Sequence, residues 1–402
     1  MKVLQVNVVY KKGSTGKIAY DLHTALIDKG VESVMCYGRG LRTSDSNVYK
    51  TCSELYAKFN NLFSRFTGIM YGGCFFSTNK LISVIKKENP DIVHLQCING
   101  YFVNIYRLIT WLKKNKIKTV LTLHAEFMHT ANCGYALDCE NWKTGCGNCP
   151  RRFKETKSFF FDNTARSFSK MKAAFDGFND DLIITSVSPW LMNRAKASPI
   201  FADKQHITIL NGLNDAIFYP HGQDEIRQKH NLKDKKFVLF VTPVFKPNKD
   251  DIKGSNYLIK LALAMPDVVF GLAGAKNINY NLPSNIINLG WLSNQDLLAK
   301  YYSAADVTLL LSKKETFSMV TAESICCGTP VVGFKAGGPE SIDFGGYTDF
   351  VEYGDIEALQ TALRKAFNAE RNFADKAHKK NKKDTMIDNY IKLYTDFLGA
   401  KG

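Results

Sequence analysis

The chain alternates short, strongly apolar runs with longer stretches in which apolar residues recur at helical spacing. Each apolar run is bounded by polar or turn-forming residues, which is typical of a buried strand. Helical stretches such as Ile18–Lys29 and Val103–Lys116 separate the runs. In the first half of the chain the runs predict strands at Lys2–Tyr10, Glu32–Tyr37, Ile92–Leu95, Thr119–Leu123 and Leu182–Ser188.

The second half repeats this alternation. Its predicted strands are Lys236–Val241, Val268–Ala273, Ile286–Leu289, Val307–Leu311 and Pro330–Phe334, and its predicted helices are Ser255–Ala264, Asn294–Ala304 and Val320–Cys327. Strands that alternate with helices form a parallel sheet with right-handed crossovers. Asn, Gly, Pro and charged residues interrupt the apolar pattern around Asn211–Asp234. We therefore predict an α/β chain of two Rossmann-like, doubly wound domains, at residues 1–211 and 212–384.

Composition supports two domains and narrows the class of partner. The 402 residues are 45% apolar, enough for two cores in domains of roughly 150 to 200 residues each. A formal net charge of +15 favours anionic partners such as nucleotides, phosphorylated lipids, nucleic acid or a membrane surface. No run reaches the roughly 18 to 20 apolar residues of a membrane span, and the first ten residues do not form a signal peptide. We expect a cytoplasmic protein, with any membrane contact peripheral.

Small residues follow the first predicted strand, in the segment Gly13-Ser14-Thr15-Gly16. Such a loop lets a phosphate approach backbone N–H groups at a helix N-terminus, where the helix dipole also favours anions. The segment is not a P-loop, because Lys11 stands where the first glycine belongs and Ile18 replaces the Ser or Thr. It also lacks the third glycine of a dinucleotide fingerprint. An anion loop of another kind and a plain tight turn both stay open.

Two carboxylates flank the end of a strand in the second half. Glu315 lies on the loop after Val307–Leu311, and Glu323 lies about one turn into the next helix. Open parallel sheets bind ligands outside the carboxyl ends of their strands. The helix N-terminus near Ser318 offers N–H groups to a diphosphate, and the carboxylates can accept hydrogen bonds from sugar hydroxyls. Alternatively, Glu315 is a solvated loop charge and Glu323 an acid favoured by the helix dipole.

Several segments in a fixed order make the chain resemble the family-4 glycosyltransferases of GT-B architecture. The resemblance extends from about Met1 to Leu398 and is specific for the family, although not for a substrate. The segments that carry it are Asp91-Ile92-Val93-His94-Leu95 with Asn99-Gly100-Tyr101, Thr122-Leu123-His124, Ser186-Val187-Ser188-Pro189-Trp190-Leu191, Asn211-Gly212-Leu213, Lys253-Gly254, Leu289-Gly290-Trp291-Leu292, Ala304-Ala305-Asp306, the Glu315–Glu323 segment and Gly337-Gly338-Pro339-Glu340.

The resemblance implies a retaining glycosyltransferase whose two Rossmann-like domains face each other across a cleft. A helix within residues 385–402 would pack back on the first domain. The second domain would hold most of the nucleotide sugar, a UDP- or GDP-sugar. No side-chain nucleophile and no catalytic metal are implied, because the leaving phosphate can itself help to deprotonate the acceptor and the enzyme mainly stabilises charge.

The resemblance also implies roles for single residues. Glu323 would bind the ribose hydroxyls of the nucleotide and Glu315 the transferred sugar. The amides around Ser318 and the Gly13–Gly16 loop would face the diphosphate. Residues beside Gly290, Trp291 among them, would contact the base. His124 matches the family's active-site histidine near the transferred sugar; a purely structural strand-end histidine is the alternative.

The chain departs from the family pattern in the diphosphate clamp. The family usually has an Arg shortly before the Lys-Gly pair, and no Arg occurs between Val241 and Gly254. Lys246 is our first candidate to replace it, beside Lys253 of the Lys-Gly pair, and Lys249 is the second. A lysine would act as a point charge without the bidentate fork of arginine.

Four cysteines cluster in the segment 133–149. They are Cys133, Cys139, Cys146 and Cys149. A Cys-x-x-Cys pair with two further cysteines within about fifteen residues can supply four thiolates to a tetrahedral zinc ion. Similar clusters follow the active-site histidine in a subgroup of the family that the chain resembles. We expect a structural zinc site here, with free or disulfide-paired thiols as the alternative.

The segment Tyr56–Tyr71 mixes aromatic and basic residues at roughly helical spacing. We interpret it as a core-facing helix. The alternative is a face that rests on an anionic membrane near a lipid-linked acceptor, as basic amphipathic helices do. The segment Trp111–Lys116 allows the same two interpretations.

The sequence thus predicts a retaining, nucleotide-sugar-dependent glycosyltransferase that acts on a saccharide or lipid-linked saccharide in surface polysaccharide biosynthesis. One alternative is a nucleotide-sugar epimerase or a glucan synthase-like enzyme on the same fold. Another is a zinc protein that uses the +15 charge to bind nucleic acid, although we expect no nucleic acid partner.

Overall fold

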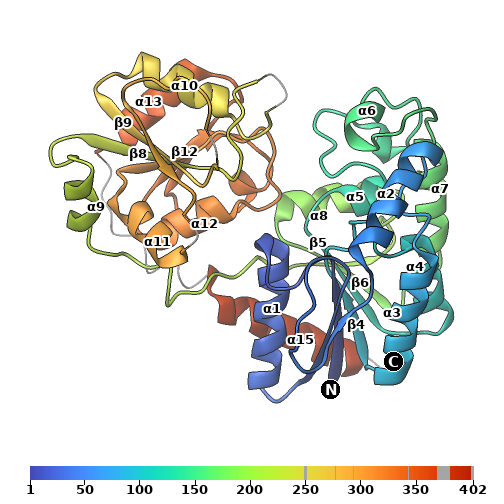
Figure 1. Ribbon diagram of the computed structural model, residues 1–402. Coiled ribbons are helices and arrows are strands. Elements are labelled where there is room, and N and C mark those ends of the chain that lie inside the picture. Colours follow the sequence, from blue (N-terminus) through green and yellow to red (C-terminus); the bar gives the residue numbers. More distant parts are fainter. Residues whose placement is uncertain (249–250, 277, 293, 343, 369–380, 400–402) are drawn as a thin grey trace. The chain divides into compact units, whose positions relative to one another are not determined.

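The computed structural model describes residues 1–248, 251–276, 278–292, 294–342, 344–368 and 381–399. The chain forms two compact units (Figure 1). Unit 1 contains Met1–Leu210 and the C-terminal segment that starts at Ile387, and unit 2 contains Asn211–Met386. Lys249, the second candidate for the diphosphate clamp, lies outside the described residues.

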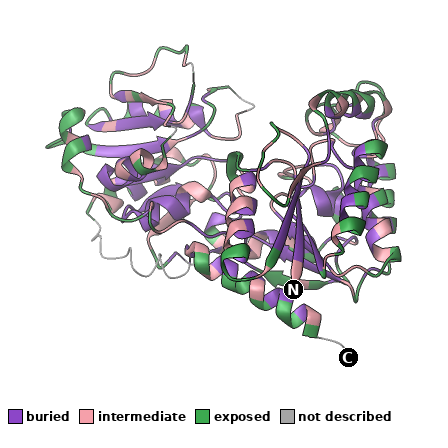
Figure 2. Cartoon of the chain, turned by 60° about the horizontal axis from the view of Figure 1, so that its bottom comes forward, coloured by how far each residue is buried: buried purple, intermediate pink, exposed green. Residues whose placement is uncertain are grey.

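Unit 1 is built on a parallel sheet of seven strands in the order β3-β2-β1-β4-β5-β6-β7. Its inner strands read as continuous apolar runs because helices cover both faces of the sheet. Figure 2 shows these strands as buried along most of their length. The strands are β1 (Lys2–Asn7), β2 (Glu32–Tyr37), β3 (Val48–Lys50), β4 (Ile92–Leu95), β5 (Thr119–Leu123), β6 (Leu182–Ser186) and β7 (Gln205–Thr208).

The helices of unit 1 lie in two layers. Helix α1 and the C-terminal helix α15 are on one side of the sheet, and α3, α4 and α7 are on the other (Figure 1). The helices are α1 (Gly13–Asp28), α2 (Glu54–Thr67), α3 (Phe75–Glu88), α4 (Ile105–Lys114), α5 (Phe127–Thr130), α6 (Arg152–Glu155), α7 (Thr164–Phe175), α8 (Pro189–Lys196) and α15 (Lys383–Gly399).

A buried polar network ties α15 to the centre of the unit 1 sheet. The Tyr394 hydroxyl lies 2.7 Å from Nδ1 of His94, and Nε2 of the same ring lies 2.7 Å from Oγ1 of Thr122. Thr122 in turn contacts the Tyr390 hydroxyl at 3.0 Å. All four side chains are buried. Each polar group therefore has a partner, as a buried polar group requires, and the last helix is fixed against β4 and β5.

Unit 2 is a second parallel sheet, of six strands in the order β10-β9-β8-β11-β12-β13. Its core packs Phe240, Phe270, Leu258, Leu309 and Phe334 between the sheet and its helices. The strands are β8 (Lys236–Val241), β9 (Val268–Ala273), β10 (Ile286–Gly290), β11 (Val307–Leu310), β12 (Val331–Phe334) and β13 (Thr348–Val351), and the helices are α9 (Asp224–Lys229), α10 (Ser255–Ala264), α11 (Gln295–Ala304), α12 (Met319–Cys326) and α13 (Ile356–Ala366).

The predicted fold class is confirmed: the chain is α/β and carries two Rossmann-like parallel sheets. The prediction missed β3, β7 and β13. None of the residues of these strands is buried, and each strand lies at the edge of its sheet with a partner on one side only. Such strands lack the continuous apolar run by which the inner strands were recognised.

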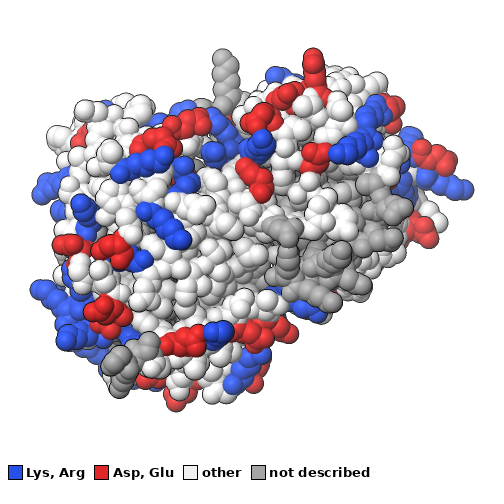
Figure 3. Space-filling model, turned by 180° about the vertical axis from the view of Figure 1, so that it is seen from behind, with Lys and Arg blue, Asp and Glu red and all other residues white. Residues whose placement is uncertain are grey.

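The surface is charged and mixed. On the face drawn in Figure 3, Lys and Arg side chains are interspersed with Asp and Glu side chains. Among the described residues, no helix combines the length and the apolar character that crossing a bilayer requires.

Candidate functional site

The strand order of unit 2 places a ligand-binding crevice between β8 and β11. The chain runs from β8 outward through β9 and β10, then returns to add β11 on the other side of β8. The loops that leave the carboxyl ends of β8 and β11 therefore turn in opposite directions. In an open parallel sheet this topological switch point is where ligands bind.

Two predicted site residues meet at this switch point. Lys253 lies on the loop after β8, and Glu315 lies on the loop after β11. Their side chains form an ion pair in which Nζ of Lys253 lies 2.6 Å from Oε1 of Glu315. The side chains are 30% and 13% exposed, respectively, so the pair is open to a ligand yet shielded from bulk water. Attraction between the two charges is correspondingly stronger than at a free surface.

The backbone of Glu315 is held by the loop that follows β12. Its N–H donates to the carbonyl of Ala336 at 2.9 Å, and its carbonyl accepts from the N–H of Gly338 at 2.8 Å. This close approach requires glycine, since a Cβ atom on Gly338 would lie 2.3 Å from the carbonyl oxygen of Thr316. The Gly337-Gly338 motif therefore positions Glu315.

Gly254 plays a similar part beside Lys253. Its φ of 83° is in the left-handed region, and a Cβ atom there would lie 2.3 Å from the carbonyl oxygen of Leu311. Glycine adopts this conformation readily, and its lack of a Cβ atom leaves room for the backbone of Leu311. The Lys-Gly pair thus sets the loop after β8 directly against the loop after β11.

Helix α12 begins at the same edge of the sheet. Ser318 precedes it with a φ of 73°, and its hydroxyl accepts a hydrogen bond from the N–H of Thr321. The N-terminal end of the helix dipole and its first N–H groups face the carboxyl edge. This is an arrangement that favours an anion such as a diphosphate.

Glu323 lies one turn into α12 and is almost completely buried. Its Oε2 accepts a hydrogen bond of 3.0 Å from the hydroxyl of Tyr302, which is itself buried. Burial raises the pKa of Tyr302 well above its ordinary value, so the phenol stays a donor. Neither Glu315 nor Glu323 is a solvated surface charge.

Two further predicted residues of unit 2 are Lys246 and Trp291. Lys246 is on the loop after β8, where its backbone N–H donates to the Ser255 hydroxyl at 3.1 Å. Trp291 follows β10, the outermost strand, and half of its side chain is exposed. Nζ of Lys276 lies 4.7 Å from the centre of the Trp291 ring. Lys276 follows β9 and Trp291 follows β10. Their contact depends on the pairing of these two strands, so the sequence alone did not indicate Lys276.

Unit 1 has its own switch point, between β1 and β4. The segment Gly13–Gly16 lies there, but it forms the first turn of α1 rather than a loop in front of the helix. The N–H of Lys11 donates to the carbonyl of Gly16 at 3.2 Å. The loop after β4 packs beside it, since Asn7 at the end of β1 accepts from the N–H of Cys97 at 3.0 Å.

His124 immediately follows β5 in unit 1 and is half-buried. Protein surrounds most of the ring, and this burial lowers its pKa to about 4. The imidazole is therefore neutral near pH 7. Two positions earlier in the chain, Thr122 belongs to the buried network of His94 and Tyr394. This network fixes the C-terminal end of β5, the strand that His124 follows.

Two residues that sequence analysis missed hold the segment after His124. The carboxylate of Glu126 is fully buried and accepts hydrogen bonds from Nε of Arg194, at 2.5 Å, and from the N–H of Ala136, at 2.8 Å. The guanidinium of Arg194 also stacks on Trp142 at 4.6 Å. Although burial acts to raise it, the pKa of Glu126 is lowered by His129 and Arg194. Glu126 and Arg194 are 68 positions apart in sequence, so only the fold reveals their contact.

The predicted zinc site is not supported. Among the residues that the structure describes, no group of three or more His, Cys, Asp or Glu side chains is arranged so that it could hold a metal ion. The four cysteines instead line one small cavity of about 20 Å³ as free thiols. Burial raises the pKa of the Cys133, Cys146 and Cys149 thiols.

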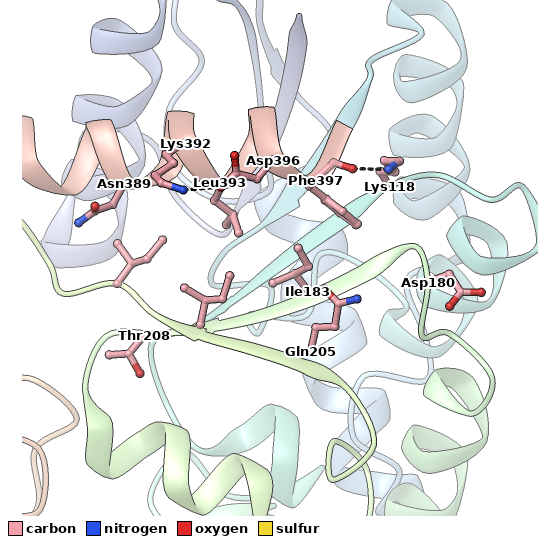
Figure 4. Close-up of a pocket in the computed structure, with 12 residues that line it drawn as sticks. Lys118, Asp180, Ile183, Gln205, Thr208, Asn389, Lys392, Leu393, Asp396 and Phe397 are labelled. Carbon is pink, nitrogen blue, oxygen red and sulfur yellow. Dashed lines mark hydrogen bonds and ion pairs between the residues drawn. The ribbon is translucent and has the colours of Figure 1, made fainter. Parts of the chain in front are cut away.

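A large groove in unit 1 is not part of the site. It has a volume of about 720 Å³ and lies between β7 and α15 (Figure 4). Lys118, Asp180 and Ile183 line it from the amino ends of β5 and β6, opposite to the edge at which parallel sheets bind ligands. Lys118 donates to the carbonyl of Phe397 across the groove.

Comparisons with known proteins agree with this geometry. Residues 222–384 match the family model described as glycosyl transferases group 1. The chain is 30% identical over 164 residues to the putative colanic acid biosynthesis glycosyl transferase WcaC of Escherichia coli K12, an alignment that covers 37% of this chain and 40% of that protein. The matched part is therefore about two-fifths of the relative's length.

A longer but weaker match is to the N-acetyl-alpha-D-glucosaminyl L-malate synthase of Bacillus anthracis. It is 23% identical over 340 residues and covers 80% of this chain and 78% of that protein. Among solved structures, Anabaena Alr3699/HepE in complex with UDP-glucose aligns with a TM-score of 0.63 at 14% identity, over 98% of this chain and 100% of that one. At this identity the similarity concerns the fold.

The family match covers the unit in which Lys253, Glu315 and Glu323 surround the switch point. The fold similarity covers both units. The predicted relationship to GT-B glycosyltransferases is confirmed at these two levels: residues 222–384 match the glycosyl transferases group 1 model, and both units share the fold of the solved structure.

Proposed function

We propose that this chain transfers a sugar from a nucleotide-sugar donor to a saccharide or lipid-linked saccharide acceptor, with retention of anomeric configuration. The observation that carries the proposal is the Lys253–Glu315 ion pair at the switch point of a glycosyl transferases group 1 domain. The Lys253 cation and the N-terminus of α12 suit the negative charge of a diphosphate. The shielded carboxylates of Glu315 and Glu323 suit the hydroxyl groups of the two sugars that flank it.

The donor is a nucleotide sugar bound by unit 2. Glu323 accepts hydrogen bonds from the ribose hydroxyls, and Glu315 accepts them from the transferred sugar. The α12 N-terminus at Ser318 and the ammonium groups of Lys253 and Lys246 meet the diphosphate. Lys253 has three N–H donors, so it can keep its bond to Glu315 and still contact a phosphate oxygen.

The base lies toward Trp291, beside Gly290 at the end of β10. The Anabaena protein of similar fold binds UDP-glucose, which supports a UDP-sugar as the first donor to test. A GDP-sugar is the second. The first turn of α1, at Gly13–Gly16, offers backbone N–H groups that suit a phosphate.

Transfer breaks the bond between the anomeric carbon and the diphosphate oxygen and forms a bond from the acceptor oxygen on the same face of the sugar. The proton of the acceptor hydroxyl passes to the leaving diphosphate. Catalysis is then mainly stabilisation of the charge that develops on the diphosphate. His124, whose pKa is lowered to about 4 by burial, contributes a hydrogen bond as a neutral imidazole rather than as a cation.

The acceptor belongs to surface polysaccharide or glycolipid biosynthesis. The name of the Escherichia coli relative, colanic acid biosynthesis glycosyl transferase, supports this assignment. Nucleic acid is a poorer partner, since basic side chains on the face drawn in Figure 3 are interspersed with acidic ones, whereas nucleic-acid sites gather them in a patch or stripe.

Product analysis separates the transferase from an epimerase on the same fold. Purified protein is incubated with UDP-glucose, alone and with a lipid-linked saccharide, and followed by ³¹P nuclear magnetic resonance. Transfer releases UDP and consumes the diphosphate ester in step with acceptor. An epimerase would leave the ester intact and change only the sugar, a result that would exclude the proposal.

Glu323→Gln provides the variant for the same assay. It keeps the shape of the side chain while removing the charge that we assign to ribose binding. Glu357→Gln is the matched control, because Glu357 is an exposed acid in the first turn of α13, another helix of unit 2. UDP release should fall in the first variant and persist in the second.

A further inference from the structure

Helix α2 has its apolar face turned away from the protein. Leu55, Phe59, Leu62, Phe63 and Phe66 are between 44 and 80% exposed. Their spacing of three or four residues places them on one side of the helix. A surface helix of a water-soluble domain normally buries such a face, so the prediction that Tyr56–Tyr71 is a core-facing helix is wrong for this part of the segment.

The buried face of α2 is small and polar instead. Its buried residues are Ala57, Asn60 and Ser64. The Asn60 side chain accepts from the N–H of Cys74 at 2.6 Å, and the Ser64 hydroxyl donates to the carbonyl of Ile69 at 3.0 Å. These bonds join the buried face of α2 to the segment that follows the helix, and the phenylalanine face lies on the other side.

Two neighbouring segments extend this apolar face. The Phe159 ring centre lies 5.3 Å and the Phe160 ring centre 6.0 Å from that of Phe66. The Phe159 N–H also donates to the carbonyl of Arg65 at 2.8 Å. At the other end of α2, Phe76 packs on Tyr56 at 5.9 Å. The aromatic surface, as we name it, consists of Leu55, Phe59, Leu62, Phe63, Phe66, Phe75, Phe76, Phe159, Phe160 and Phe161, all of them exposed.

Several lysines lie near the aromatic surface, and the nearby carboxylates contact other groups of the protein. Lys58 on α2 and Lys154 and Lys157 just before Phe159 are exposed. Of the acids, Glu54 pairs with Arg39 at 2.8 Å and Asp162 accepts from the N–H of Thr164 at 3.0 Å. Glu155 pairs with Arg151. Glu54 and Glu155 are thus each paired with an arginine, whereas the three lysines are exposed.

A basic groove adjoins the aromatic surface at Phe75. It has a volume of about 590 Å³, and Phe75 lines it together with Trp111 and the cations Arg107, Lys114 and Lys170. None of the residues that line it is an Asp or a Glu. A groove with an aromatic wall and cations at its edge suits the phosphate of a lipid above its acyl chains.

We propose that unit 1 docks on an anionic lipid bilayer through the aromatic surface, with the phenylalanines in the interfacial layer and the surrounding cations on lipid phosphates. Contiguous exposed apolar patches mark interaction sites. A phenylalanine-rich helix face flanked by basic residues is typical of interfacial binding. A second copy of the chain fits less well, because a two-fold interface would bring the same cations against one another.

The test is co-sedimentation of the full chain with vesicles. Vesicles of phosphatidylcholine alone are compared with vesicles that also contain phosphatidylglycerol, at low and high salt. We expect binding to the anionic vesicles that weakens with salt. The Phe59→Ser/Phe63→Ser variant should bind on the order of tenfold less at either salt concentration, because it loses apolar burial. The Lys58→Glu/Lys154→Glu variant should lose the preference for phosphatidylglycerol.

Leu263→Ser is the control variant, because Leu263 is 68% exposed on α10 of unit 2, outside the aromatic surface. It should bind vesicles as the wild type does. The substituted side chains are exposed, so thermal unfolding should be unchanged in every variant. Release of UDP from a soluble donor should also persist in the phenylalanine variant, which keeps the docking test independent of the proposed function.

Two results would overturn the docking proposal. One is wild-type protein that ignores anionic vesicles or a Phe59→Ser/Phe63→Ser variant that binds them equally well. The other is a dimer in sedimentation velocity that this variant dissociates, which would make a second copy the occupant of the surface.

Discussion

Nζ of Lys253 and Oε1 of Glu315 lie 2.6 Å apart although the two residues are 62 positions apart in sequence. They come from loops that follow different strands, so the strand order of unit 2 brings them together. A Lys253→Met substitution removes a cation that we assign to the diphosphate. We expect turnover to fall on the order of 100-fold, because the leaving group loses part of its charge stabilisation.

Lys260→Met is the control for Lys253→Met, because Lys260 is an exposed cation on the following helix. Steady-state kinetics of UDP release measure both variants. Equal rates in the wild type and in Lys253→Met would remove Lys253 from the diphosphate site.

Gly338 tests whether the loop after β12 positions Glu315. A Cβ atom there would lie 2.3 Å from the carbonyl oxygen of Thr316, so Gly338→Ala must displace the backbone beside Glu315. A shift of about 1 Å can cost on the order of 100-fold in rate. Gly222→Ala is the matched control, since a Cβ atom at Gly222 has no atom within 4 Å. A fully active Gly338→Ala enzyme, with kinetics like those of the control, would contradict a positioning role.

His124 is assigned to the transfer step rather than to donor binding. His124→Ala should therefore lose turnover on the order of 100-fold, the range of a catalytic acid, base or hydrogen-bond donor. Its affinity for UDP, measured by calorimetry, should change by less than about threefold. His206→Ala on β7 serves as the control in the same unit. Turnover in His124→Ala at the wild-type rate would leave only a structural role for this ring.

Three histidines of unit 1 predict a loss of stability in acid. Burial lowers the pKa of His23 to about 4, of His124 to about 4 and of His94, beside His124, to about 3. A histidine in an unfolded chain titrates near 6.5. Between about pH 6.5 and 4 the unfolded chain thus binds more protons than the folded chain. The free energy of unfolding is therefore fully present above about pH 6.5 and falls as the pH is lowered through this window.

Urea unfolding at a series of pH values between 7 and 4 measures this effect. Each histidine contributes a slope of up to about 1.4 kcal/mol per pH unit. His94→Gln, which also loses one partner of Tyr394, should be less stable at pH 7 but should show a shallower slope. An unchanged slope in His94→Gln would mean that folding does not lower the pKa of His94.

The inner strands, and the places of Glu315 and Glu323 in the fold, could be predicted because each depends on a local pattern. A strand such as β11 is a continuous apolar run, and Glu315 and Glu323 are placed by the strand, loop and helix on either side of them. The Glu126–Arg194 pair and the His94–Tyr394 contact join distant segments. No periodicity in one segment reveals such a partner.

Helix α2 shows a different limit of sequence reasoning. The spacing of Phe59, Phe63 and Phe66 defines an apolar face. It does not show whether that face packs against the protein core or is exposed at the surface. The polar residues Asn60 and Ser64 lie on the buried face of the helix instead, and both bond to backbone atoms outside α2. The cysteine cluster shows a related limit, since spacing alone does not determine whether thiols converge as metal ligands.

Calorimetric titration of UDP-glucose into the wild type, Glu323→Gln and Glu357→Gln tests most directly whether unit 2 is the donor site. Glu323 is buried and bonded to Tyr302 at 3.0 Å, which holds in place the carboxylate that we assign to the ribose. Loss of a charged hydrogen-bond acceptor should weaken binding by roughly 10- to 100-fold. We predict tight binding by the wild type and by Glu357→Gln, and weakened binding by Glu323→Gln. Equal affinity in all three proteins would contradict a donor site at the β8–β11 switch point.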